Sequence, residues 1–589
     1  MPPGKGAHNL TVYEEVRFVT HRRRSAKLLS VFLGLSLVGG LAACGDDDDE
    51  GGGTTDTTEG EGATETTGEG AAGEAAMTVT YSLNPDAVWE DGSPITVDDF
   101  ACTWNATLNT PASLSTVGYD LITSVEAGEE NEVVVSFSEV YAPYKNLFNP
   151  IIKAGAVADC NDVSADFGTE IPISGRPWML ESWSPEQAIL VPNEAYWDDE
   201  DIPVAERVVM VPKADSDTEV ASLLSGESEF IFPQAFSGIN EALNDPNIEF
   251  TPGYGTNYEG LYFQQREGPF ADDDYRAAFS MSIDRDAILQ SIYEPIFPGA
   301  PLLQCGLWVP TIGDWCDDTD FVDSFDPEGA AALLEGAGWT LNADGLWEKD
   351  GAVPQVRWIV NTGNSRREST QALMIPALRE AGFDVIADNC DAACYFQQRL
   401  PALDYDLAMY INTAAPDPTV TGIMHCDSVP SEANGNQGQN STGWCNEEAS
   451  AAMTESDQTV DEAARVELIH QIGDALVADH VMLPLYQFPN IAAWRTDRLE
   501  GPIDADAGNY RAFSNNMFDW EPVGDSEIII GAEQWPECLN PITECANSSW
   551  YVWTTAFQVL PGAFDTTAEG EYVITDLLTE EPVVETAEG

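Results

Sequence analysis

The chain has 589 residues and a mass of 63.8 kDa, more than one compact core, and 43% of its residues are apolar, so we expect two or three lobes. Its 101 acidic and 24 basic residues give a formal net charge of −77. Such a chain offers no basic surface to neutralise phosphates, which excludes nucleic acid as a partner. The excess of acidic residues is typical of proteins that function at high salt, where dissolved ions screen the repulsion between carboxylates. The alternative interpretation is that the negative potential of the protein attracts a cationic ligand.

The N-terminal segment differs from the rest of the chain. Residues 1–43 carry 6 Lys or Arg and 2 acidic residues, and a basic cluster precedes an apolar run over residues 28–38. We interpret residues 1–43 as a lipoprotein signal peptide, because the run is too short for a comfortable membrane span. Residues 41–44 (LAAC) resemble the bacterial lipobox, which makes Cys44 the expected site of lipid attachment. The alternative is an ordinary cleavage site that precedes a cysteine.

Residues 44–76 are predicted to form a flexible tether. After Cys44 this segment contains 11 acidic residues, 9 Gly, 7 Thr and 5 Ala, and its largest apolar side chain is that of alanine, so it cannot collapse. The acidic run at residues 46–50 lacks the loop pattern of a calcium site and is interpreted as solvated. We therefore expect the tether to hold the folded body at the outer face of the cytoplasmic membrane, and the lipid to be the only attachment to the membrane.

The body contains ten further cysteines, and disulfides are their expected use in a secreted chain. Proximity in the sequence suggests Cys305 with Cys316, Cys390 with Cys394, Cys426 with Cys445, and Cys538 with Cys545, which leaves Cys102 and Cys160 to pair over a longer loop. A zinc site would need clustered ligands, and only His425 beside Cys426 is suggestive. No metal site is predicted.

Short β-rich segments alternate with capped helices along the body, the pattern of an α/β fold. One expected helix begins at Asp326 and Pro327 and stops at Gly338, and another carries an apolar stripe over residues 460–476. Strands are expected at residues 133–137, 188–191, 207–211, 260–264, 356–360 and 527–530. We found no phosphate-binding glycine loop, nucleophile elbow or zinc-protease motif, so we predict neither catalysis nor a cofactor.

Several phrases resemble, in order, the family 5 solute-binding proteins of ABC importers, the peptide and nickel group. They are residues 83–100 (LNPDAVWEDGSPITVDDF), 174–183 (SGRPWMLESW), 191–197 (VPNEAYW), 219–229 (EVASLLSGESE), 275–288 (YRAAFSMSIDRDAI), 404–410 (DYDLAMY) and 483–487 (LPLYQ). The resemblance covers most of the body and implies a two-lobed periplasmic-binding-protein-like fold of type II, with an extra domain in lobe one.

The beginning of the family pattern is missing where it belongs, before residue 77. Residues 527–541 (EIIIGAEQWPECLNP), near the other end, resemble the family's first strand and the turn after it. We therefore interpret the chain as circularly permuted, with residues 546–563 as the following helix and 572–585 as strands that would run on into residue 77. The alternatives are a truncated second copy and a gene rearrangement that does not fold.

The resemblance then divides the body into five segments. They are residues 77–172, the extra domain; 173–265, lobe one; 266–485, lobe two; 486–524, again lobe one; and 525–589, the family's N-terminal segment, which completes lobe one and the extra domain. Two such lobes close on a ligand by hinge motion.

Candidate ligand-binding residues follow from this division. Aromatic side chains suit peptide side chains and sugar rings alike, and the candidates are Tyr258, Trp308, Trp535, Trp550 and Trp553. In the family's peptide binders an Asp anchors the ligand's ammonium group, and here that position falls on Ala414. Asp417 is the nearby candidate to replace it.

The expected function is that of a monomeric, membrane-anchored lipoprotein that captures a solute, with an oligopeptide as the leading class, and delivers it to the permease subunits of an ABC importer. The alternatives are a non-peptide solute such as a sugar or metal chelate, a sensor role, or a secreted hydrolase. The absence of a nucleophile and base in the sequence disfavours the hydrolase.

Overall fold

The computed structural model describes residues 75–234, 237–319, 321–322, 324–434, 437–501, 503, 512–567 and 570–587. The predicted signal peptide, Cys44 and the tether up to residue 74 lie outside these residues. Residues 71–589 form one compact unit, and everything below concerns its described part. Among the described residues, no helix is both long enough and apolar enough to cross a membrane.

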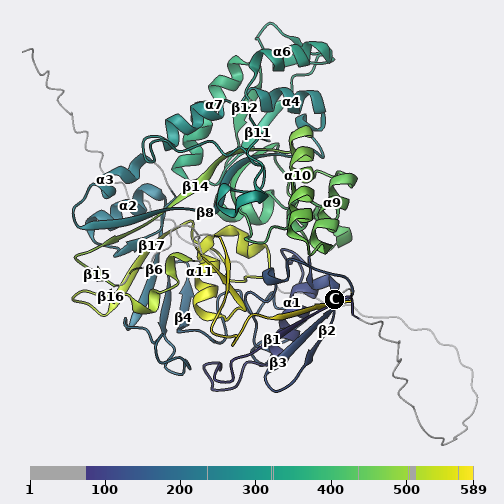
Figure 1. Cartoon of the computed structure of the whole chain (residues 1–589). Coiled ribbons are helices and arrows are strands. Elements are labelled where there is room, and N and C mark those ends of the chain that lie inside the picture. Colours follow the sequence, from purple (N-terminus) through teal and green to yellow (C-terminus); the bar gives the residue numbers. More distant parts are fainter. Residues whose placement is uncertain are drawn as a thin grey trace, which may run out of the picture. The chain divides into compact units, whose positions relative to one another are not determined.

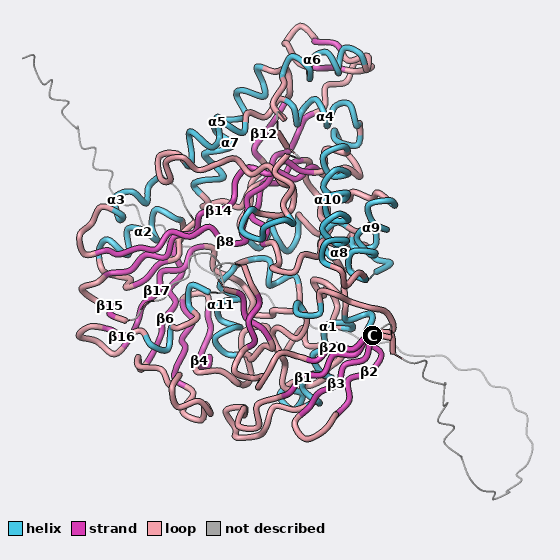
Figure 2. Tube along the Cα trace, viewed as in Figure 1, coloured by secondary structure: helices cyan, strands magenta, loops and turns pink. Residues whose placement is uncertain are grey.

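A ten-stranded mixed sheet runs through both lobes in the order β12-β11-β13-β8-β14-β7-β17-β6-β5-β4 (Figures 1 and 2). In chain order these strands are β4 (Trp178–Ser184), β5 (Gln187–Pro192), β6 (Arg207–Lys213), β7 (Phe230–Ile231), β8 (Ile248–Phe263), β11 (Gln355–Ile359), β12 (Asp384–Ala387), β13 (Leu407–Thr413), β14 (Met482–Arg495) and β17 (Glu527–Glu533). The two long strands β8 and β14 pair antiparallel in the middle of the sheet. They belong to both lobes, so the fold is a two-lobed α/β architecture.

Lobe one holds the β7-β17-β6-β5-β4 side of this sheet. Strand β17 comes late in the chain, yet it pairs in parallel with β6 along its whole length, from Glu527 opposite Arg207 to Glu533 opposite Lys213. It also pairs in parallel with β7, so neither of its edges is open. The lobe's helices are α2 (Ser216–Ser225), α3 (Asn240–Leu243) and α11 (Trp550–Val559). A segment from the end of the chain is therefore an interior part of this lobe.

Lobe two holds the β12-β11-β13 side. Its helices are α4 (Asp273–Met281), α5 (Arg285–Ile288), α6 (Pro327–Gly336), α7 (Ser365–Glu380), α8 (Thr421–Met424), α9 (Glu447–Gln458) and α10 (Glu462–Ala478), and its small strands are β9 (Thr340–Leu341) and β10 (Trp347–Glu348). Helix α6 has the predicted ends: the Asp326 side chain accepts from the Gly329 N–H, and Gly338 has a φ of 88°, which favours glycine. Helix α10 lies where the apolar stripe predicted it.

A separate four-stranded sheet, in the order β2-β3-β1-β20, forms the extra domain with helix α1 (Val97–Asn109). Its strands are β1 (Met77–Ser82), β2 (Ile122–Ala127), β3 (Glu132–Phe137) and β20 (Val583–Thr586). Strand β20 pairs antiparallel with β1, with Thr586 opposite Met77. The Ala587 N–H donates to the Ala76 carbonyl at 3.0 Å, so the two ends of the described body lie side by side. Figure 1 shows the C-terminus at this sheet.

The remaining strands form two small pairs, β15 (Leu499–Glu500) with β16 (Glu521–Pro522) and β18 (Phe564–Thr566) with β19 (Tyr572–Ile574). Two expected elements differ from those found. The strand expected at 260–264 is the end of the longer β8, and the helix expected at 546–563 is only α11, because a 3-10 turn (Glu544–Ser548) precedes it and Ser549 caps its start.

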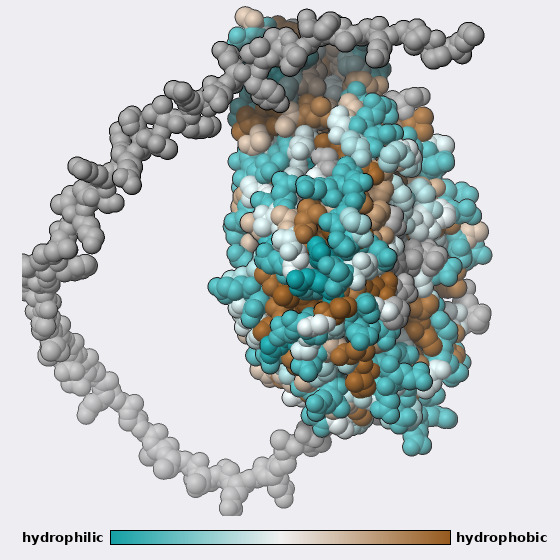
Figure 3. All heavy atoms as spheres, turned by 90° about the vertical axis from the view of Figure 1, so that its left-hand side faces the viewer, coloured by the Kyte–Doolittle hydropathy of each residue, from teal (hydrophilic) through white to brown (hydrophobic). Residues whose placement is uncertain are grey.

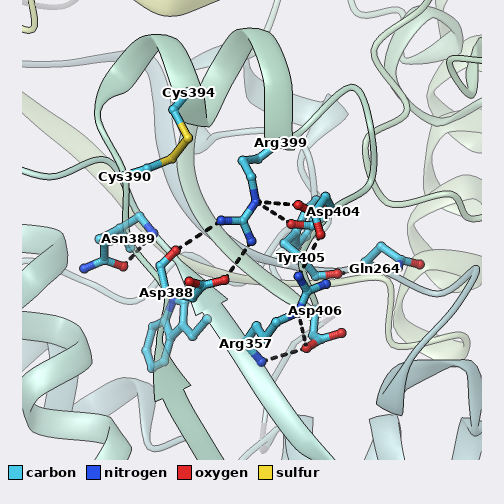
Figure 4. A network of polar contacts seen from close by, with 12 residues as sticks. Gln264, Arg357, Asp388, Asn389, Cys390, Cys394, Arg399, Asp404, Tyr405 and Asp406 are labelled. Atoms are coloured by element: carbon cyan, nitrogen blue, oxygen red, sulfur yellow. Dashed lines mark hydrogen bonds and ion pairs between the residues drawn. A yellow bond between two sulfur atoms is a disulfide. The ribbon is translucent and has the colours of Figure 1, made fainter.

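The structure contains the five expected disulfides: Cys102–Cys160, Cys305–Cys316, Cys390–Cys394, Cys426–Cys445 and Cys538–Cys545. The Cys390–Cys394 bond lies beside an ion network at the lobe-two end of the large sheet (Figure 4). There Arg399 pairs with Asp388 at 2.8 Å and Asp404 at 3.1 Å, while Arg357 pairs with Asp404 at 2.7 Å. The side chain of Arg357 lowers the pKa of the Asp404 carboxyl.

Hydrophilic residues dominate the face of the molecule in Figure 3, and separate apolar patches interrupt them. This agrees with the acidic composition of the chain. The interior of the described body holds three large apolar clusters: one in lobe one with the extra domain, one in lobe two, and one that joins helices α2 and α3 of lobe one to lobe two.

Candidate ligand cleft

Three cavities that share lining residues lie between the lobes and the extra domain, and we call them together the central cleft. The middle cavity has a volume of about 300 Å³, and it adjoins one of about 310 Å³ toward the extra domain and one of about 80 Å³ toward lobe two. The shared residues are Leu114, Phe396, Ile411, Asn412, Thr419, Ile423, Gln439, Asn547 and Trp553. A cleft of this size, formed where lobes meet, is the usual place of a small-molecule site.

Helix α11 supplies the aromatic wall of the central cleft. Trp550 and Trp553 are three residues apart, so they share one face of the helix, and both line the middle cavity. The Ser549 hydroxyl accepts from the Tyr551 N–H at 3.0 Å and fixes the start of the helix at this wall. The Trp553 ring stacks on Phe557, with ring centroids 5.6 Å apart. Two indole faces thus come from lobe one.

An amide-rich floor comes from β8, which both lobes share, and from β13 of lobe two. Asn257 is fully buried, and its Oδ1 accepts from the Thr413 hydroxyl at 2.7 Å. Its Nδ2 has no hydrogen-bond partner in the described part of the chain, although the residue lines the middle cavity. On β13, the Asn412 Nδ2 donates to the Tyr262 hydroxyl at 3.0 Å. A buried donor without a partner is costly, and a ligand acceptor or water would satisfy it.

Gln534 joins the lobes at the back of the cleft. It follows β17 with a φ of 52°, which is uncommon for a residue other than glycine. Its Oε1 accepts from Asn361 of lobe two at 3.0 Å and from Gln234 of lobe one at 3.2 Å, and its Nε2 donates to the Ser548 carbonyl at 2.8 Å. This backbone conformation therefore places one amide where it bonds to both lobes.

A buried ion triad lies behind these amides. Glu259 on β8 pairs with Arg366 and Arg367 at the start of α7; the Arg367 Nε lies 3.0 Å from the Glu259 Oε1. The exposed fractions of the three side chains are 0%, 0% and 2%. Burial alone would lower the pKa of Arg366, but the Glu259 carboxylate raises it above its ordinary value. The triad is charged and is shielded from solvent.

A further cavity of about 230 Å³ adjoins the central cleft through Gln234 and Gln534. Its lining also includes Lys213, Asp215 and Trp535, so it is charged where the middle cavity is mostly neutral. The Trp535 ring stacks on Trp183 with centroids 6.4 Å apart, and its Nε1 donates to the Ser184 carbonyl. This indole is therefore held by contacts within lobe one.

The predicted ligand-binding residues divide into three groups. Trp550 and Trp553 line the central cleft, and Trp535 lines the adjoining charged cavity. Tyr258 and Trp308 are each 1% exposed, belong to an apolar cluster of lobe two, and line none of the five cavities described. The structure therefore does not support these two as cleft residues.

The two misplaced aromatics have separate physical reasons. Successive side chains on a strand point to opposite faces, so Asn257 lies at the cleft and its neighbour Tyr258 does not. Trp308 follows Cys305 in a disulfide loop that folds inward, and its side chain packs in the core.

Asp417 is also outside the central cleft. It pairs with Arg465 of α10 at 2.5 Å and lines a different cavity, of about 500 Å³, between lobe two and the extra domain. Sequence reasoning expected it to replace an ammonium anchor, but its charge is already paired. The sequence did not reveal four polar residues of the cleft, because neutral amide side chains belong to no motif. They are Asn257, Asn412, Gln439 and Gln534.

Metal ligands do not gather in the central cleft among the described residues. Cys426 is in a disulfide, and the neighbouring His425 accepts from the Asp427 N–H through Nδ1, which removes the one suggestive zinc pair. The carboxylates of Asp198, Asp201 and Asp576 lie within 4.8 Å of one another, outside the cleft. Burial, together with the other two carboxylates, raises the pKa of Asp201 to about 6.

Asp457 on α9 lies behind the cleft residue Thr419. Its Oδ2 accepts from the hydroxyls of Thr421 at 2.6 Å and Thr419 at 3.0 Å, while its Oδ1 has no partner among the described residues. Burial raises the pKa of this carboxyl from 3.8 to about 6, and the two threonine hydroxyls offset part of that rise. The folded state therefore binds this proton more tightly than the unfolded state does.

Replacing Asp457 with Asn should stabilise the protein at neutral pH but not in acid. In the parent, the contribution of Asp457 to the free energy of unfolding is most favourable below about pH 4. This contribution, about 3 kcal/mol, is lost as the pH rises through about 6. Urea unfolding of D457N and the parent should thus give a stability difference that grows between about pH 4 and about pH 8. The matched control is D344N, at an exposed turn; equal pH profiles for D457N and the parent would contradict the prediction.

The comparisons with known proteins agree with this architecture. The family model described as bacterial extracellular solute-binding proteins, family 5 Middle, matches residues 72–431. The oligopeptide-binding protein AppA of Bacillus subtilis is 23% identical over 440 residues, which cover 70% of this chain and 76% of AppA. The probable monoacyl phosphatidylinositol tetramannoside-binding protein LpqW of Mycobacterium tuberculosis is 29% identical over 178 residues, only 28% of each chain.

Solved structures show the same fold. The structure of AppA from Bacillus subtilis in complex with a nonapeptide has a TM-score of 0.66 at 20% identity, and the match covers 76% of this chain and 88% of AppA. NikZ from Campylobacter jejuni in complex with Ni(L-His) has a TM-score of 0.64 at 19% identity, and the match covers 76% and 89%.

Fold and cleft together define the class as a two-lobed solute-binding protein. The chain belongs to the bacterial extracellular solute-binding proteins of family 5. Proteins of this family bind their ligands without transforming them, so this chain is a binding protein and not an enzyme.

Proposed function

We propose that this protein is a lipid-anchored receptor on the outer face of the cytoplasmic membrane, which captures a solute in the central cleft and delivers it to the permease subunits of an ABC importer. The observation that carries the proposal is the cleft itself, lined by lobe-one aromatics and by amides from both lobes in a chain of this family. Lobe closure would enclose a ligand between these two surfaces. We expect the receptor to act as a monomer.

The names of the relatives and of the solved structures point to different classes of ligand. The names of the relatives AppA and OppA, both oligopeptide-binding proteins, favour an oligopeptide. The name of LpqW refers instead to a glycolipid, and a bound Ni(L-His) appears with NikZ. The residues that line the central cleft are this chain's own feature that bears on the ligand class.

Circular permutation remains part of the proposal, and the sheets support it. Residues 527–533 form an interior strand of lobe one, and residues 583–586 pair with β1 of the extra domain. The hydrogen bond from the Ala587 N–H to the Ala76 carbonyl also supports the proposal that the new ends lie in one hairpin. A tandem second copy would leave lobe one without β17 and would open a sheet edge between β6 and β7.

Exchanging Cys44 for Ser tests the anchor and the capture function together. The C44S variant should appear in the medium instead of the membrane fraction, because the thiol that would carry the lipid is lost. Harvested under native conditions and then unfolded, it should release a solute that mass spectrometry detects. Membrane retention of C44S would refute the anchor. Protein that never carries a solute, from the medium or from membranes, would refute capture.

A further inference from the structure

The central cleft lacks acidic residues in a very acidic protein. Of the 589 residues 101 are Asp or Glu, yet none is among the described residues that line the three cavities. The one cationic lining residue is Arg367, whose Nε pairs with Glu259 and whose Nη1 bonds to the Asn361 side chain. A ligand charge of either sign would therefore lose its water without gaining a free counter-ion, which is costly.

The polar lining instead consists of amides and hydroxyls. Amide side chains both donate and accept hydrogen bonds, and so do ligand hydroxyl groups. In the middle cavity the described residues of this kind are Gln234, Asn257, Asn412, Gln439, Gln534 and Asn547, with Thr413, Thr419 and Ser549. The unpartnered, fully buried Nδ2 of Asn257 is a donor that a ligand oxygen would satisfy.

Trp550 and Trp553 supply the apolar contacts of the cleft. Indole rings offer flat apolar faces, which suit the C–H faces of a sugar ring as well as other apolar surfaces. A ligand with hydroxyls at its rim and apolar ring faces would contact the amide floor of β8 and β13 and the indole wall of lobe one at the same time.

We propose that the ligand is an uncharged, hydroxyl-rich compound of the oligosaccharide class, and that Asn257 Nδ2 donates a hydrogen bond to one of its oxygens. This rests on the proposed function, since it assumes capture in the central cleft. A peptide with a free ammonium group fits less well, because the candidate anchor Asp417 is paired with Arg465 in another cavity.

Isothermal titration of the full chain with two panels of probes tests the proposal. One panel contains neutral gluco-, manno- and xylo-oligosaccharides, and the other contains short peptides with free termini. We expect an oligosaccharide to bind and the peptides not to bind. Exchanging Asn257 for Asp keeps an acceptor for the Thr413 hydroxyl but replaces the donor, so N257D should bind that oligosaccharide at least about tenfold more weakly.

Asn490 on β14 provides the matched control. It is also fully buried with unpartnered side-chain atoms, and it lines none of the five cavities described. N490D should thus share any cost of a buried charge but keep the parent's affinity. If N257D unfolds, N257S provides the second variant, with the same loss expected.

The outcomes separate the two proposals. Peptide binding without oligosaccharide binding would overturn the ligand class and leave the capture function standing. Oligosaccharide binding that N257D and N257S leave unchanged would overturn the role of Asn257. Failure of both panels, together with no solute released on unfolding, would contradict capture and the ligand class alike.

Discussion

A chain truncated after Val523 should no longer unfold in a single cooperative transition. The truncation removes β17 from between β6 and β7, and with it the fully buried side chains of Ile528 and Ile530. It also removes α11, which packs on lobe one, and β20 from the extra domain. These losses should exceed the roughly 5–15 kcal/mol that typically stabilises a folded domain. Near-ultraviolet circular dichroism during heating measures the result.

A rearranged chain is the matched control for this truncation. It would begin at Ser526, run to Ala587, continue through a short turn into Ala76 and end at Val523. Because Ala587 and Ala76 are already hydrogen bonded, the turn should join them without strain, and this chain should melt like the parent. A truncated chain that melts cooperatively would refute the structural role of residues 525–587, and a rearranged chain that fails to fold would refute the permutation.

The second large effect is expected at Glu259. Exchanging it for Gln leaves Arg366 and Arg367 buried without their carboxylate, so the free energy of unfolding should fall by about 3–5 kcal/mol. Urea unfolding at neutral pH measures this change. Ligand affinity should fall as well, because Arg367 lines the cleft and its orientation depends on Glu259.

Asp384 is the control for Glu259. It pairs with Arg379 at 2.9 Å, but 52% of the Arg379 side chain is exposed. D384N should therefore cost less than about 1 kcal/mol, as exposed pairs do. If E259Q proved as mild as D384N, water or a rearranged partner would have to satisfy the two guanidiniums, and the triad would not be a main source of stability.

Local signals in the sequence were enough to predict much of the fold. Helix α6 has both of its predicted ends because Asp326 and Gly338 act on their immediate neighbours. Strands β3, β5, β6 and β17 lie where apolar runs predicted them. Four of the disulfides join cysteines that are close in the chain, so proximity sufficed for them, and Cys102 and Cys160 were the two that remained. The family phrases added the two-lobed arrangement, which no local pattern contains.

The lining of the cleft was harder to predict, because it depends on which face of a strand looks into the space between lobes. Tyr258 was chosen for its ring, but the adjacent Asn257 is the residue at the cleft. An amide has no spacing rule or motif, and its role appears only when its unpartnered Nδ2 is seen beside a cavity. Trp550 and Trp553 were predictable because a helix face keeps its residues together.

The covalent cross-links are confined to separate bodies. Cys102–Cys160 lies in the extra domain, Cys538–Cys545 in lobe one, and the other three disulfides in lobe two. The backbone passes between the lobes along β8 and β14 alone within the described residues. The disulfides can thus stiffen each lobe, while none of these cross-links restricts the two strands that join the lobes.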